Sequence, residues 1–116
     1  MLKVVVPFSK WLRGEGSSVS RLHRPSDGKR CCLGQAEIAA GATVNEIFDI
    51  SSPSLMTNNR IPALMVGRDL YMQTSQICFN LMRANDTKNT SDEQKVKDIT
   101  ALGVKAGIEF EFDPQN

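Results

Sequence analysis

Apolar and polar residues alternate at both ends of the chain. Near the carboxyl end, apolar positions 108, 110 and 112 alternate with Glu109 and Glu111, which is typical of a strand with one buried face. Residues 2–6 are apolar except for Lys3, and Pro7 follows them, so they are also predicted to form a strand. We expect the two strands to pair as neighbours, with Lys3 opposite Glu109 or Glu111.

Helical spacing and helix-end signals predict the elements between these strands. Residues 8–12 are predicted to form a short helix that ends at Gly14, and residues 33–40 one that ends at Gly41. Residues 45–48 predict a further turn of helix. Residues 75–84 place Ile77, Leu81 and Met82 on one side, as expected of a helix that packs on a core. Ser91 and Gln94 match a capping box, and we expect the helix that follows to end at Gly103.

A β-hairpin is expected just before the helix predicted at residues 33–40. Residues 19–24 alternate in polarity, residues 25–28 read Pro-Ser-Asp-Gly, which favours a turn, and residues 29–31 would return as the second strand. On such a hairpin Arg21 and His23 would project from one face. The predicted fold is therefore a single α+β domain over residues 1–116, with a short antiparallel sheet that includes both terminal strands and is packed by three or four helices.

Composition limits the class of protein but does not indicate an activity. A chain of 116 residues, 41% of them hydrophobic, has enough apolar material for one core. No run approaches the roughly 20 apolar residues of a membrane span, and no secretion signal is recognised. Three cysteines, two of them adjacent, do not resemble a secreted disulfide framework, so we expect a cytoplasmic protein that does not bind a membrane.

Charge is distributed unevenly along the chain. Residues 1–30 carry seven lysines and arginines against two carboxylates, a net charge of +5, whereas residues 31–116 carry seven against eleven, a net charge of −4. This split is consistent with an anionic partner, with a self-complementary dimer, or with a solvated basic face that binds nothing. We do not expect long duplex nucleic acid as the partner, because protein domains that bind it are more basic overall than this chain.

The basic residues are interleaved with small residues that suit phosphate recognition. Arginine side chains, serine hydroxyls and glycine-exposed amides are the groups that such recognition uses. Trp11 could stack on a base or could instead pack in the core, and the arginines could lie along the surface without a ligand. The candidate ligand-binding residues are Trp11, Arg13, Ser17, Ser18, Arg21, His23, Arg24, Lys29 and Arg30.

The sequence gives less support for a catalytic or metal site than for these ligand-binding residues. Cys31 and Cys32 are adjacent, unlike the spaced cysteines of structural zinc sites, and His23 is the only histidine, so no metal or other cofactor is expected. Buried, unreactive cysteines are the favoured interpretation, with a redox role as an alternative. A nucleophile activated by His23 stays a third possibility for a small hydrolase or transferase, although no nucleophile elbow, metal-binding pair or Walker loop is present.

Two segments carry a resemblance to a family. Residues 10–17 (KWLRGEGS) and 27–34 (DGKRCCLG) resemble small uncharacterised bacteriophage and prophage proteins, in which Trp-Leu-Arg-Gly precedes Gly-Lys-Met-Cys-Cys-Leu-Gly. Arg30 replaces the methionine of that pattern, Asn85-Asp86 and residues 107–110 match it, and residues 51–73 have no counterpart. The resemblance implies an origin in phage and a host bacterial cytoplasm, without an established activity.

Small phage proteins of this kind are often accessory factors that bind host machinery, which suggests two functions by analogy. The first is a non-enzymatic protein, expected to be a homo-oligomer, that counters host defence by sequestering an anionic nucleotide signal in a basic pocket. The alternative is a protein-binding inhibitor, similar to an anti-CRISPR protein, that docks on an acidic surface of a host protein.

Overall fold

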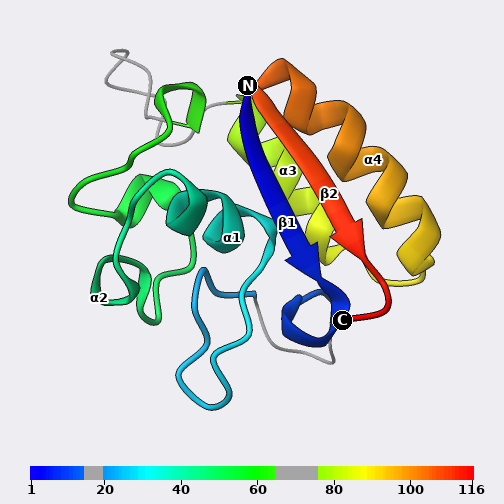
Figure 1. Ribbon diagram of the computed structural model, residues 1–116, viewed down its shortest axis with the longest axis horizontal. Coiled ribbons are helices and arrows are strands. Elements are labelled where there is room, and N and C mark those ends of the chain that lie inside the picture. The colour runs from blue at the N-terminus through cyan, green and yellow to red at the C-terminus, as the bar shows by residue number, and fades with distance from the viewer. Residues whose placement is uncertain (15–19, 65–75) are drawn as a thin grey trace.

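The computed structural model of the protein describes residues 1–14, 20–64 and 76–116 (Figure 1). Within them lie strands β1 (Leu2–Pro7) and β2 (Ile108–Asp113) and helices α1 (Cys32–Ala39), α2 (Val44–Ile47), α3 (Gln76–Asp86) and α4 (Asp92–Lys105). Short 3-10 turns occupy Phe8–Lys10, Pro53–Leu55 and Pro62–Leu64. No helix of these described ranges is long and apolar enough to span a membrane.

The two terminal strands pair with each other, but in the parallel direction. Their register runs from Leu2 opposite Ile108 to Pro7 opposite Asp113, and it places Lys3 opposite Glu109 as predicted. The predicted antiparallel sheet is wrong. Figure 1 shows the reason: α4 runs back alongside β2 and returns the chain to the end of the sheet where β1 begins. Alternating polarity does not distinguish the two directions, because side chains alternate in both.

The core lies between one face of this sheet and the helices. β1 contacts α1, β2 contacts α4, and α3 packs against both α1 and α4. Val4, Val6, Ile108 and Phe110 point into the core, whereas Lys3 and the two glutamates of β2 are exposed on the opposite face. The alternation read from the sequence is therefore the alternation of burial in both strands.

Helix α4 starts as predicted but ends later than predicted. The Ser91 hydroxyl accepts a hydrogen bond from the Gln94 backbone N–H at 3.1 Å, while the Gln94 side chain donates to Asp98 instead of reaching back to Ser91. Gly103 does not end the helix. It is a packing position, because a Cβ there would lie 2.5 Å from the Phe110 ring, so only glycine lets β2 approach α4 this closely.

Glu37 is a fully buried acid on α1. Its Oε1 accepts a hydrogen bond from the Arg60 backbone N–H at 2.9 Å, and its Oε2 has no hydrogen-bond partner among the described residues. The Arg60 guanidinium donates to the Gly41 carbonyl and to both oxygens of Glu46. Residue 60 therefore ties the long connection after α2 to α1 and α2. Burial raises the pKa of Glu37. The hydrogen bond from the Arg60 N–H and the Arg60 charge lower this pKa, but their effect is smaller.

We expect Glu37→Gln to remove a pH dependence of stability. Because the folded state holds the pKa of Glu37 above its ordinary value of 4.5, the carboxyl contributes fully below that pH, and its contribution is lost as the pH rises through the folded pKa. The wild type should therefore lose stability relative to E37Q as the pH rises above 4.5, by at most about 1.4 kcal/mol per pH unit. Urea denaturation from pH 4 to 8 measures this difference.

Glu46→Gln is the matched control, because the pKa of Glu46 is shifted the other way. The Thr43 backbone N–H is the main group that lowers it. The wild type should then lose stability relative to E46Q as the pH falls below 4.5. The same pH trend in both variants would contradict the assignment for Glu37.

Candidate functional site

Residues 20–30, here called the basic loop, form a hydrogen-bonded turn at the surface. The Arg24 N–H donates to the Lys29 carbonyl and the Gly28 N–H donates to the Arg24 carbonyl, both at 2.8 Å. Gly28 has a φ of +74°, a conformation that glycine adopts without strain. The basic loop carries Arg21, Arg24, Lys29 and Arg30 against Asp27, a net charge of +3.

The predicted hairpin strands are not formed by the described part of this segment. The Cys31 N–H does donate to the Arg21 carbonyl at 3.1 Å, but each arm also bridges to a different neighbour, His23 to Phe48 and Arg30 to Trp11. The arms are therefore joined by the two backbone hydrogen bonds Arg24 N–H to Lys29 carbonyl and Cys31 N–H to Arg21 carbonyl, without forming a regular pair of strands. Residue 19, with which the first strand was expected to begin, lies outside the described residues.

Two arginines of the basic loop are held by carboxylates. Arg21 Nε donates to Asp49 at 3.1 Å, and Arg24 donates to both oxygens of Asp27. Hydrogen bonds from Arg24 and then from the Lys29 backbone N–H hold the pKa of Asp27 well below its usual range. Pairs this exposed contribute little to stability, so their effect is to fix the guanidinium groups in place.

His23 connects the basic loop to the residue that follows α2. Its ring stacks on Phe48, with centroids 5.6 Å apart and an angle of 29° between the planes. Its Nδ1 accepts a hydrogen bond from Arg30 Nε at 3.1 Å. A Cβ at Gly28 would lie 3.6 Å from Cε1 of the imidazole, so the turn packs on this ring as well. Burial first, and then the Arg30 charge, lower the pKa of His23, partly offset by Asp27.

Phe48 is the exposed apolar side chain beside these cations. It is 49% exposed although it is a large aromatic residue, and Val44, four residues earlier, is also exposed. Val44 opens α2 and Phe48 directly follows its last residue, Ile47; these two exposed apolar residues are here called the Phe48 patch. A capping box between Thr43 and Glu46 fixes the start of α2 and with it the position of this patch.

Trp11 lies in the core, which is one of the two alternatives that the sequence left open. It has no exposed surface, and its ring packs against Phe8 and Phe112 with centroid distances of 5.2 and 4.6 Å. Its Nε1–H donates to Asn85 Oδ1 at 2.8 Å. A ligand could stack on Trp11 only if this part of the core opened.

Asn85 is the centre of a buried polar network that the sequence did not indicate. Its Oδ1 also accepts from the Cys32 N–H at 3.2 Å, and its Nδ2 donates to the Leu12 carbonyl at 2.9 Å and to Asp86 at 2.8 Å. The nearby Ser20 hydroxyl donates to the same Asp86 oxygen. The contacts of residues 85 and 86 join segments that lie more than 50 residues apart along the chain.

Arg13 is separate from the basic loop and faces α4. Its Nε and Nη2 donate to the two carboxylate oxygens of Asp92 at 2.8 and 3.0 Å, and its guanidinium lies over the rings of Phe8 and Trp11. The hydrogen bonds from Arg13 lower the pKa of Asp92. The other two candidates, Ser17 and Ser18, lie outside the described residues.

The cysteines are buried, as the favoured interpretation expected. Burial raises the pKa of Cys31 to about 12 and that of Cys78 to about 11, and it raises that of Cys32 as well. Thiols with such pKa values are almost entirely protonated at neutral pH, which makes them poor nucleophiles. His23 makes its ring contacts with Arg30 and Phe48. In the described ranges no group of three or more His, Cys, Asp or Glu side chains could hold a metal ion.

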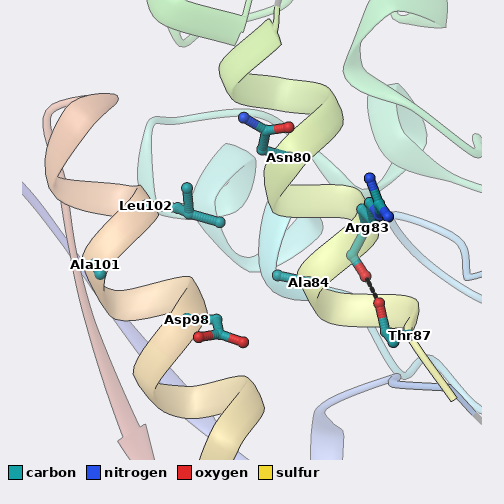
Figure 2. A pocket seen from close by; sticks show the side chains of 7 residues that line it. All are labelled: Asn80, Arg83, Ala84, Thr87, Asp98, Ala101 and Leu102. Carbon is teal, nitrogen blue, oxygen red and sulfur yellow. Dashed lines mark hydrogen bonds between the residues drawn. The ribbon is translucent and has the colours of Figure 1, made fainter. Parts of the chain in front are cut away.

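A groove of about 410 Å³ runs between α3 and α4, away from the predicted residues. Figure 2 shows Asp98 and Leu102 pointing from α4 toward α3, with Asn80, Ala84 and Thr87 on the opposite wall. None of the sequence-predicted site residues lines this groove. Its lining includes one basic residue, Arg83, and one acidic residue, Asp98, so these two charges balance.

No protein-family model, curated protein or solved structure matches the chain. The candidate site therefore rests on its own geometry, which brings together five of the nine predicted residues on one loop: Arg21, His23, Arg24, Lys29 and Arg30.

Sequence reasoning missed Phe48 and Asp49, which complete this surface. A signal was present, because Thr43 and Glu46 match a capping box, and this would have placed a short helix directly before Phe48. Nothing in the sequence indicates that residues 48–50 would lie beside residues 22–23, since these contacts are long-range.

Proposed function

We propose that this protein is a non-enzymatic binding protein that docks on an acidic surface of a partner protein through the basic loop and the Phe48 patch. The observation that carries the proposal is the exposed Phe48 ring stacked on His23 next to a loop of net charge +3. Exposed aromatic and arginine residues side by side are the composition of binding hot spots, with a small apolar centre and a charged rim.

The arrangement of the arginines supports a protein surface as the partner. Arg21 and Arg24 are already oriented by Asp49 and Asp27, which lowers the entropy lost when they meet carboxylates of a partner. The resemblance to small phage proteins supports a bacterial host protein, bound to counter host defence. Nucleotide sequestration remains the other prediction, and titration with a panel of signalling nucleotides tests it.

We expect Phe48→Ala to weaken partner binding about tenfold, because a hot-spot aromatic supplies that much or more. The immobilised protein is exposed to bacterial lysate at low and high salt, and bound proteins are quantified by mass spectrometry. The specific partner should be retained by the wild type at low salt and released by high salt, and F48A should bind it about tenfold more weakly.

Phe79→Ala is the matched control, because Phe79 on α3 is 51% exposed and is not part of the Phe48 patch. It should retain the partner as the wild type does. Equal retention by F48A, F79A and the wild type would contradict the proposal, as would a partner whose retention is unaffected by salt.

A further inference from the structure

His23 is placed so that its protonation changes the basic loop. Its Nδ1 accepts from Arg30 Nε at 3.1 Å, and no hydrogen bond of the Arg30 Nη groups is found among the described residues. A guanidinium only donates hydrogen bonds, so the contact requires a neutral imidazole that carries its proton on Nε2. When Nδ1 takes a proton, the acceptor is lost and two cations face each other.

The charged groups around the His23 imidazole determine which contacts change when it is protonated. Arg30 and Asp27 lie on the basic loop itself, and Asp49, which follows Phe48, is paired with Arg21. The backbone N–H of Asp49 donates to the His23 carbonyl at 2.9 Å, and this bond does not depend on the imidazole. Protonation therefore breaks the Arg30 contact while the loop stays anchored beside residue 49.

We propose that His23 regulates the docking surface: neutral His23 holds Arg30 against the basic loop, and protonated His23 releases Arg30 toward carboxylates of the partner. Protonation also raises the net charge of the basic loop from +3 to +4. Binding of an acidic partner then strengthens as the pH falls below neutrality. This regulation rests on the proposed function, but the proton-dependent contact can be measured without any partner.

NMR of the free protein tests the contact, and the assignment is unambiguous because the chain has one histidine. We expect the Nε2–H tautomer above pH 7, a His23 midpoint below 6.5, and a change of the Arg30 Nε–H signal with the same midpoint. Arg30→Ala should move the midpoint upward, whereas Arg21→Ala, the control, should leave it in place. An Nδ1–H tautomer, or a midpoint unaffected by R30A, would overturn the proposal.

Binding to poly-L-aspartate, whose carboxylates stay ionised from pH 7.5 to 6.0, tests the regulation. The wild type should bind about threefold more tightly at pH 6.0 than at pH 7.5. His23→Gln, which cannot take up the proton, should lose this difference, and R30A should keep only the part that comes from the added charge of protonated His23. Equal wild-type affinity at both pH values, with a normal His23 titration, would overturn the regulation. Absence of binding at both pH values would instead contradict the proposed function, while the NMR result still decides whether the contact depends on the proton.

Discussion

Replacing Asn85 with alanine is expected to lower the free energy of unfolding by about 4 kcal/mol. The substitution removes one side chain that bonds to groups from several segments of the chain. The Trp11 Nε1–H, the Cys32 N–H and the Leu12 carbonyl would remain in the interior without a partner. An unsatisfied buried polar group costs about 1–3 kcal/mol, and the alanine also leaves a small cavity.

Urea denaturation followed by the fluorescence of Trp11, the single tryptophan, measures the loss. Asn80→Ala is the matched control on the same helix, because the Asn80 side chain bonds only to the exposed Gln76 among the described residues. It should cost less than about 0.5 kcal/mol. If N85A and N80A were equally stable, the buried network would not hold the fold together.

Asn85→Asp separates the donor from the acceptor part of this network. Aspartate keeps the oxygen that accepts from Trp11 but replaces the amide donor with a second oxygen, which would face the Leu12 carbonyl and Asp86. We expect N85D to lose stability as the pH rises, since a buried charge next to another carboxylate is unfavourable. A variant as stable as the wild type at pH 7 would contradict this orientation of the amide.

Replacing Gly34 with alanine is expected to cost about 3 kcal/mol of stability, because it overpacks a contact between main chains. A Cβ at Gly34, in the first turn of α1, would lie 1.9 Å from the Leu22 carbonyl oxygen. Leu22 belongs to the basic loop, and its N–H donates in turn to the Ile50 carbonyl at 2.7 Å. The added methyl group would therefore displace the basic loop from α1 and weaken partner binding as well.

Gly107→Ala is the control for this substitution. Gly107 has a φ of +75°, and a Cβ added there would meet no other atom within 4 Å, so its alanine variant carries only backbone strain of about 1–2 kcal/mol. The same denaturation experiment compares the two variants. A G34A variant more stable than G107A would show that α1 and the basic loop do not meet at Leu22.

The sequence predicted local elements well, because their signals are local. The terminal strands, the Ser91 cap and the helices near residues 33–40, 45–48, 75–84 and 92–103 follow from periodicity and end residues, and the structure contains them. The predicted helix at residues 8–12 is only a 3-10 turn over Phe8–Lys10, and the strands of the predicted hairpin are not formed in its described part. The direction of the sheet could not be predicted in this way, since it depends on the path of the whole chain. Gly103 was misjudged for a related reason: its role is set by Phe110, which approaches from another element.

The candidate site was predicted only in part. The cations of the basic loop are visible in the sequence, and Asp27 is near enough along the chain to be expected as the partner of Arg24. Asp49 and Asp92 are 28 and 79 residues from the arginines they bind, so no local pattern could assign them. A similar separation between Trp11 and Asn85 left the role of the tryptophan undecided.

The pairing of β1 with β2 also sets the order of events during synthesis. A growing chain makes Leu2–Pro7 long before the strand that pairs with it, which ends at residue 113, so this sheet cannot form until that residue has left the ribosome. Closing so long a connection is slow. Until then the apolar segment 2–6 has an unpaired backbone, and Lys3 is the charge within it that opposes aggregation of nascent chains.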